Sequence, residues 1–298
     1  MVGLFLCFNF YMYIYIVRYC KPLFINLLLL FHVNECAAQE VYFKHWIQTL
    51  TDSSLGGRPS GSAYELKTLH LIEHEIKQSG FTVRLQHFSY LDPDSAKQLK
   101  ACNLYSFINH KADSTILLSA HYDHLGKNKS KSKEIRVSTF HPGANDNASG
   151  VAMLLYLLKT KKQWMSRHYN YLIVFYSAHE TGLFGSSVFY KNIGSTFKLK
   201  TVINFDMVGR LYQHQLHIAS NSNMPNLVDS IQIVQEKEEL LTQLDTKEYF
   251  HQGIQCYNVS TGLFPEYHTT KDTENRIHYQ GMVQIYNWLK NWLFEISQ

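Results

Sequence analysis

The sequence lacks the features that would assign it to a nucleic-acid-binding or modular class. It has no basic stripe interleaved with aromatic side chains, and its formal net charge of +4 is small for 298 residues. The basic run at residues 126–136 is typical of a solvated loop. After the first 38 residues there is no internal repeat, low-complexity tract or linker. These absences favour one globular domain that does not bind nucleic acid.

Cysteine is also scarce. Three of the five cysteines lie in the first 38 residues, which leaves Cys102 and Cys256. Two cysteines do not make a disulfide framework, and neither stands in a spacing typical of zinc-binding cysteines. The sequence is compatible with one disulfide between these two cysteines and with two buried free thiols.

The first 38 residues have the pattern of a leader. Basic residues precede an apolar run at 22–33, and the small-residue stretch NECAAQE follows. This order predicts a secretory signal cleaved after Ala38, with 39–298 as a single domain of an exported (periplasmic or extracellular) monomer. The apolar run is too short to span a bilayer. Residues 1–17 are apolar too, so a membrane-anchored form is the alternative.

Apolar periodicity predicts an α/β fold. Helical spacing occurs at residues 40–51, 62–79, 148–162, 224–241 and 281–296, and another helix starts near residue 183. Alternating or continuous apolar runs predict strands at 81–90, 103–109, 114–120, 170–178, 200–209 and 214–220. The central runs are apolar throughout, as in strands covered on both faces. We therefore expect a three-layer α/β/α domain whose mixed, mostly parallel sheet is antiparallel at one side.

Polar side chains directly follow the apolar runs of three of these predicted strands. His121, Asp123 and His124 follow the strand at 114–120, His179 and Glu180 follow 170–178, and Asp206 follows the apolar part of 200–209. Two further polar clusters, GANDNASG and PEYHTTKDT, supply Asp146, His268 and Asp272. Ligands of such sheets bind beyond the carboxyl ends of the strands, so these clusters stand where a site is expected.

Each cluster alone has an ordinary structural explanation. An aspartate at a strand end usually forms a turn, GANDNASG could cap a helix, and a lone histidine is more often hydrogen-bonded at the surface. Five clusters at expected positions favour a shared site instead. Histidine and carboxylate ligands suit zinc or a similar divalent ion. A bridging aspartate with two carboxylates and two imidazoles suits two metals about 3.5–4 Å apart.

Five ordered motifs, SAHYDHLG, GANDNASG, HETGLFGS, NFDMVGR and YHTTKDT, resemble the zinc aminopeptidases of metallopeptidase family twenty-eight. The resemblance covers roughly residues 55–275 and implies a zinc-exopeptidase-like fold with two zinc ions. It implies one zinc held by His121 and Asp206, a second held by Glu180 and His268, and Asp146 as the bridge.

Three other residues take roles from the same resemblance. Asp123 would accept the second N–H of His121 and orient its ring, with a plain turn residue as the alternative. Asp272 would support His268 in a similar way. Tyr267, beside His268, would either donate a hydrogen bond to the oxyanion or simply pack.

One position departs from the family. Most members carry glutamate immediately before the metal-binding glutamate, and that residue is the general base; here the position is His179. Moving the register by one would place Thr181, a poor zinc ligand, in the ligand position. Neighbouring residues point in opposite directions, so Glu180 can face the metal while His179 faces water and substrate. A neutral imidazole can accept a proton.

We therefore predict an exported zinc aminopeptidase that acts on peptides. One alternative is a glutaminyl cyclase, which forms pyroglutamate with one zinc on the same fold; the GLFGS and DNASG motifs favour the peptidase. Carboxypeptidase relatives usually carry extra domains, for which this chain leaves little room. The last alternative is a catalytically weak metal-binding homologue, because imidazole and carboxylate differ in length and aim.

Overall fold

The computed structural model describes residues 21–224 and 230–296, with side chains described from residue 36 on. The chain divides into two compact units, Met1–Tyr42 and Phe43–Gln298. Helix α2 (Lys21–Thr51) runs through the expected cleavage position. Residues 1–20 of the expected leader lie outside the described part, so the leader stays a prediction. No described helix is long and apolar enough to cross a membrane.

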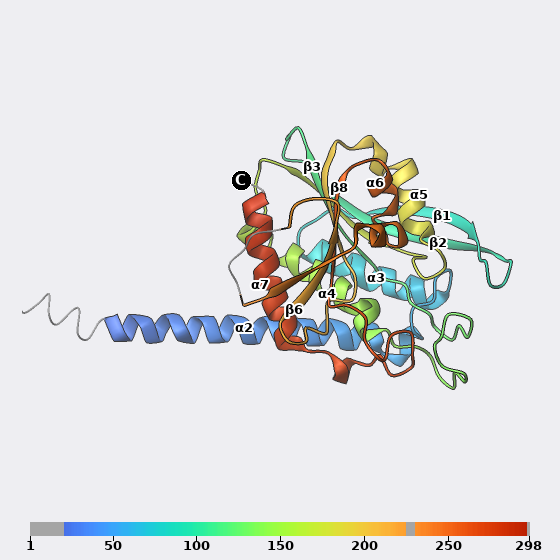
Figure 1. The fold of residues 1–298 in the computed structure, drawn as a ribbon, viewed down its shortest axis with the longest axis horizontal. Coiled ribbons are helices and arrows are strands. Elements are labelled where there is room, and N and C mark those ends of the chain that lie inside the picture. Colours follow the sequence, from blue (N-terminus) through green and yellow to red (C-terminus); the bar gives the residue numbers. More distant parts are fainter. Residues whose placement is uncertain (1–20, 225–229, 297–298) are drawn as a thin grey trace, which may run out of the picture. The chain divides into compact units, whose positions relative to one another are not determined.

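One mixed sheet organises the described part of the second unit (Figure 1). Its eight strands are β1 (Arg84–Leu91), β2 (Gln98–Ile108), β3 (Thr115–His121), β4 (Asn170–Tyr176), β5 (Leu199–Phe205), β6 (Gln215–Ser220), β7 (Gln232–Glu236) and β8 (Gln255–Ser260). They lie in the order β1-β2-β4-β3-β5-β8-β6-β7. Strands β4, β3, β5 and β8 run parallel, whereas β1 and β2 form an antiparallel edge. The predicted fold class is confirmed.

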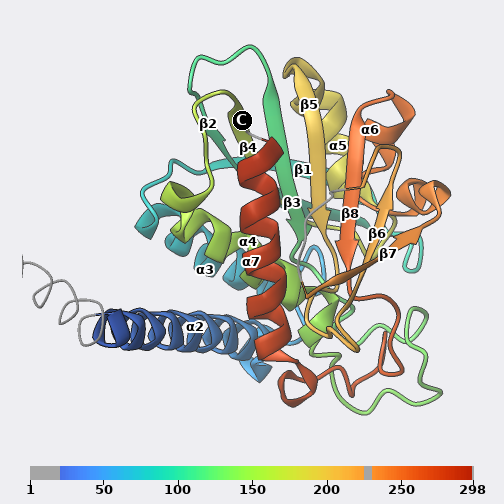
Figure 2. The same ribbon diagram turned by 60° about the vertical axis from the view of Figure 1, so that its left-hand side comes forward.

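Helices cover both faces of this sheet (Figure 2). Helices α3 (Ala63–Gln78), α4 (Gly150–Lys159) and α7 (Tyr279–Ile296) pack on one face, and α5 (Phe184–Asn192) and α6 (Lys247–His251) on the other. Short turns are η2 (Ser53–Leu55), η3 (Ala144–Ser149), η4 (Lys161–Gln163), η5 (Gly194–Thr196), η6 (Glu238–Gln243) and η7 (Glu274–Arg276). The arrangement is the three-layer α/β/α fold expected from the alternating pattern.

The middle strands form a rigid platform. Every residue of β3 and of β4 is buried, which explains their continuous apolar sequences. Strand β1, exposed on one face, alternates instead. Tyr176 at the end of β4 packs with Phe189 of α5 and hydrogen-bonds Tyr249 of α6 at 2.8 Å between their hydroxyls. The end of β4 is thereby fixed to the helices on that face.

The structure differs from the sequence expectation in one region. The helix predicted at 224–241 is wrong from residue 232 on, where β7 and then η6 stand; residues 225–229 lie outside the described part. Ile231, Ile233 and Val234 fit either periodicity, and parallel pairing with β6 decides for a strand. Strand β8 was not predicted, because it buries the polar side chains of Asn258 and Ser260. The side-chain amide nitrogen of Asn204 in β5 donates to the side-chain oxygen of Asn258 at 2.8 Å, so that buried oxygen has a hydrogen-bond partner.

Candidate active site

The carboxyl ends of β3, β4 and β5 deliver the predicted polar residues to one edge of the sheet. His121 is the last residue of β3, and Asp206 directly follows β5. His179 and Glu180 stand in the turn after β4. Because these strands are parallel neighbours, the residues converge as expected.

The GANDNASG loop joins the strand ends to helix α4. The Asn147 amide nitrogen donates to the carbonyls of His121 and Phe205, at 3.2 and 2.9 Å, and so links β3 to β5. Its oxygen accepts the N–H of Gly150, the first residue of α4. Gly143 precedes the loop with φ of 61°, and a Cβ there would lie 2.4 Å from the His124 ring. The loop therefore holds Asp146 between the strand ends.

Five predicted ligands surround two adjacent points. His121 Nε2 lies 3.4 Å from Asp146 Oδ1 and 3.5 Å from Asp206 Oδ1. His268 Nε2 lies 3.2 Å from Asp146 Oδ2 and 3.2 Å from Glu180 Oε2. Asp146 thus offers one oxygen to each group.

These separations fit metal coordination better than direct hydrogen bonds. Two ligand atoms on a tetrahedral zinc, with bonds of about 2.0–2.1 Å, stand roughly 3.3–3.4 Å apart. His121 Nε2 and His268 Nε2 are buried, yet neither makes a hydrogen bond with any described residue. Buried polar atoms rarely remain without a partner, so both nitrogens fit a metal ion as the missing one.

His124 adds a contact that the sequence did not specify. Its Nδ1 lies 2.7 Å from Glu180 Oε1, and its side chain is fully buried. That distance is a hydrogen bond rather than the edge of a coordination sphere. The bond fixes one oxygen of Glu180 and leaves the other, Oε2, for the group around His268.

His179 lies beside the ligand group of His121 and Asp206, but its ring is in a different plane from the His121 ring. The rings of His121 and His179 stack with centroids 3.8 Å apart and planes 6° apart. A metal ion bound by an imidazole lies in the plane of that ring. Because the two rings are stacked, an ion bound by His121 would lie out of the plane of His179, separated from it by about the distance between stacked rings. Although ligand atoms of His121, His179 and Asp206 approach within 4.8 Å, this stacking argues against a shared metal for both histidines.

Sequence reasoning missed the partner of His179. Its Nδ1 lies 2.9 Å from Oδ2 of Asp245, a buried residue between η6 and α6. No local sequence motif surrounds Asp245. Only the tertiary fold brings the two together.

Two supporting aspartates act differently from the expectation. Asp123 faces His121 Nδ1 with its main-chain carbonyl at 3.2 Å, while its carboxylate lies 3.8 Å away. That carboxylate accepts the backbone N–H groups of His179 and Glu180, at 3.1 and 3.2 Å. Asp123 thus positions the turn after β4.

The prediction that Asp272 supports His268 is wrong. His268 Nδ1 instead lies 3.0 Å from the carbonyl of Lys131. The buried Asp272 carboxylate accepts the backbone N–H groups of Asn145 and Asp146, each at 3.0 Å. Asp272 therefore fixes the bridging residue, because the loop backbone offers it donors that the His268 ring does not.

The electrostatics of the cluster suit a cation. Burial alone would lower the pKa of His121, but the carboxylates of Asp123, Asp146 and Asp206 outweigh it and raise that pKa well above its usual value. Burial likewise opposes the shift at His268, yet Asp146 and Glu180 raise its pKa to about 10. Without a metal these imidazoles carry protons among carboxylates, and metal binding would displace those protons.

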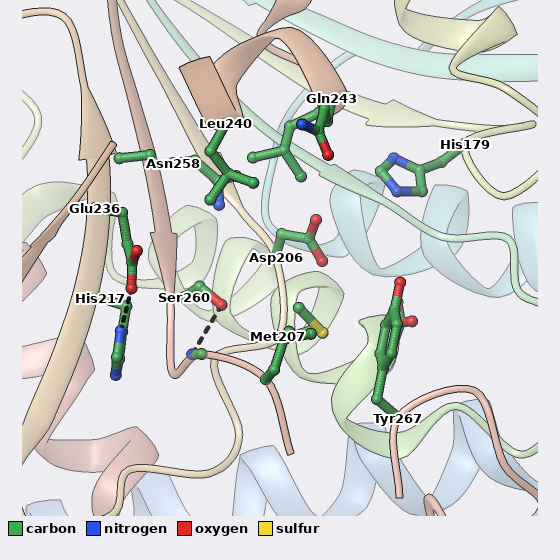
Figure 3. Close-up of a pocket in the computed structure, with 15 residues that line it drawn as sticks. His179, Asp206, Met207, His217, Glu236, Leu240, Gln243, Asn258, Ser260 and Tyr267 are labelled. Atoms are coloured by element: carbon green, nitrogen blue, oxygen red, sulfur yellow. Dashed lines mark hydrogen bonds and ion pairs between the residues drawn. The ribbon is translucent and has the colours of Figure 1, made fainter. Parts of the chain in front are cut away.

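A hollow of about 510 Å³ opens beside the cluster (Figure 3). Asp146, His179 and Asp206 line one part, and Tyr267 directs its hydroxyl toward the same space. Apolar walls come from Met207, Ala219, Leu240, Leu244 and Leu263, and the paired His217 and Glu236 stand farther away. Burial and the nearby carboxylates raise the pKa of Tyr267, so its hydroxyl keeps the proton that a donor needs.

Known proteins resemble this chain in part of its sequence and in its fold. Aminopeptidase YwaD of Bacillus subtilis (strain 168) is 29% identical over 194 residues, which are 59% of this chain and only 40% of that relative. A zinc aminopeptidase structure from Bacillus subtilis matches 86% of this chain and 95% of its own, with a TM-score of 0.69 and 16% identity. The Porphyromonas gingivalis glutaminyl cyclase structure covers the same 86% of this chain and 98% of its own, with a TM-score of 0.71 and 19% identity.

These structural likenesses establish the shared fold, and the family assignment comes from the sequence. Residues 103–293, well over half of the chain, match the family described as Peptidase family M28. The matched range contains all five residues that surround the two points. The chain therefore belongs to peptidase family M28, a family of metallopeptidases.

Proposed function

We propose that this protein is an exported zinc aminopeptidase in which Asp146 bridges two metal ions. His121 and Asp206 complete one site, and Glu180 and His268 the other. The observation that carries the proposal is the set of 3.2–3.5 Å separations around two buried nitrogens that lack a hydrogen bond. Zinc bound there would acidify water and polarise the scissile carbonyl.

His179 is the general base of this proposal. Its ring lines the hollow, next to the ligands but outside their metal planes. The imidazole takes a proton from the attacking water and delivers it to the leaving amine, so that water adds across the C–N bond. Tyr267 donates a hydrogen bond to the developing oxyanion from the opposite side of the hollow.

The apolar part of the hollow receives the side chain of the N-terminal residue. Leu240, Leu244 and Met207 provide contact area, while Asp146 and Asp206 lie at the inner end. A free peptide N-terminus is cationic, and this end of the hollow is rich in carboxylates. We therefore propose short peptides as the substrates. We also propose that the protein works as a monomer.

An assay of three reactions tests the assignment. Aminoacyl chromogenic substrates, N-terminal glutaminyl peptides and internal peptide bonds are compared before and after chelation, and again after zinc is restored. Zinc-dependent release of the first amino acid supports the aminopeptidase. Pyroglutamate formation would identify a cyclase, and zinc binding without turnover a lapsed enzyme; either result rejects the proposal.

Two variants separate base from ligand. His179→Ala is expected to lower kcat about 10²- to 10⁴-fold and to retain zinc. Glu180→Ala is expected to lose both activity and part of the bound zinc. Unchanged turnover in His179→Ala would remove His179 from the mechanism, whereas loss of zinc would make it a ligand.

Export has its own test. The proposal predicts that the mature protein recovered outside the cytoplasm begins close to residue 39, which N-terminal sequencing measures. A full-length protein in the membrane fraction would support the anchored alternative.

A further inference from the structure

The buried carboxylate of Asp245 interacts with two polar side chains, His179 and Ser186, and the contact with His179 is the stronger one. Asp245 is 1% exposed, and its Oδ1 makes no hydrogen bond with any described residue. Its Oδ2 lies 2.9 Å from His179 Nδ1. A buried carboxylate is costly unless partners compensate it, and His179 is the main group that compensates Asp245.

The segment that carries Asp245 is fixed to β4, the strand that precedes His179. Tyr249, in the helix that follows, hydrogen-bonds Tyr176 at the end of β4 and is fully buried. Thr246 donates to the carbonyl of Leu241 at 3.0 Å, which closes the turn around Asp245. The distance between Asp245 and His179 is therefore set by the core.

The His179 ring is held on two sides. One face stacks on His121, and Nδ1 points at Asp245. The remaining nitrogen, Nε2, is the only position of the ring from which a proton can be exchanged with the hollow. A hydrogen bond from Nδ1–H to the carboxylate selects the tautomer in which Nε2 carries a lone pair.

We propose that Asp245 is the positioning residue for His179, and that the pair together takes the role that the sequence resemblance assigns to a glutamate at this position. A glutamate base brings one negative charge and one acceptor to the metals. A neutral imidazole brings the acceptor alone, and Asp245 restores the charge from behind the ring. This inference rests on the proposed role of His179.

The central test is Asp245→Asn, which keeps the shape of the side chain. An amide can donate to Nδ1, which moves the ring proton to Nε2 and removes the acceptor. We expect kcat to fall about 10²- to 10⁴-fold, with KM and zinc content nearly unchanged. Glu248→Gln is the matched control, because Glu248 lies three residues farther along, in α6, and its carboxylate accepts the hydroxyl of Ser187 at 2.7 Å; its kcat should equal that of the parent.

A double-mutant cycle separates this inference from the proposed function. In a His179→Ala background, Asp245→Asn should lower kcat no further, since the group through which it acts is gone. If the fold-losses in kcat of the two single variants multiply in the double variant, Asp245 acts independently of His179 and the inference is overturned. Full activity in Asp245→Asn beside a dead His179→Ala would also overturn it while the function stands. Full activity in His179→Ala would instead refute the base itself.

A second measurement, on the parent protein, needs no variant. In the zinc-loaded parent protein, ¹⁵N NMR of labelled histidine should show His179 as the neutral tautomer with its proton on Nδ1. Detection of the proton on Nε2 would overturn the inference whatever the kinetics.

Discussion

The hollow has two sides that are built in different ways. The motif side consists of the ends of β3, β4 and β5, turn η3 and residues 265–273, and the buried carboxylates of Asp123 and Asp272 hold its backbone through hydrogen bonds. The wall side consists of pocket-lining residues of β6, β7, β8 and η6, whose side chains range from buried (Ala219, Asn258) to exposed (Gln243). Under the proposed function, the motif side acts on the bond that all peptides share, whereas the wall side contacts the side chain that differs between peptides. Asp245 is the exception, since it comes from the wall segment and contacts the motif side.

The largest effect is expected at the centre of the motif side. Asp146→Asn removes the charge shared by both groups of ligands, and amides are poor zinc ligands. We expect loss of both metals and a fall in kcat/KM of at least about 10³-fold for every substrate. Metal analysis after gel filtration, alongside the peptide assay, measures both. One metal kept at full occupancy would show that Asp146 is not the bridge.

A smaller effect is expected one contact farther out. Asp272→Asn replaces one of the acceptors for the N–H groups of Asn145 and Asp146 with a donor. The loop should shift, and zinc affinity should fall about 10- to 100-fold, as for other residues that orient ligands. Chelator competition measures the affinity, with Glu274→Gln as the control, because the half-buried Glu274 carboxylate accepts from Gln48 and Tyr279. Unchanged affinity would mean that the loop holds Asp146 without Asp272.

The two sides also differ in how far the sequence predicts them. His121 and Asp206 directly follow apolar runs, so their place at the sheet edge follows from strand periodicity and parallel pairing. Asp245 was missed because it stands in an irregular segment, 66 residues from His179, and only packing brings it there. Strand β7 was missed because an edge strand shows the same mixture of apolar and polar residues as an amphipathic helix. Local pattern thus predicts the ligands, while the wall depends on tertiary contacts.

A change on the wall side should alter selection without altering chemistry. Leu240→Ala removes apolar contact area from the hollow. We expect kcat/KM to fall about tenfold for substrates with N-terminal leucine or phenylalanine and to stay constant for N-terminal alanine. The ratio of the two rates measures the effect. An equal loss for both substrates would break the distinction between the two sides.

The smallest effect on catalysis is expected behind the motif side, at Glu65. This buried carboxyl accepts the Gly61 N–H at 2.7 Å and contacts the Ser177 hydroxyl, two residues before His179. Burial raises the pKa of Glu65 to about 8, so the folded protein holds a proton that the unfolded chain releases at the ordinary pKa of about 4.5.

The sign of the resulting pH dependence follows from that difference. Because the folded-state pKa is the higher one, the stabilisation is fully present below pH 4.5 and is lost as the pH rises through about 8. Glu65→Gln mimics the protonated form, since its amide can accept from Gly61 and donate to Ser177. We expect the Tm of the parent to fall relative to that of the variant between pH 5 and 8.5, with kcat equal in both at pH 7. A constant difference in Tm would show that Glu65 is ionised in the fold, and a loss of kcat would extend the motif side to the layer beneath the ligands.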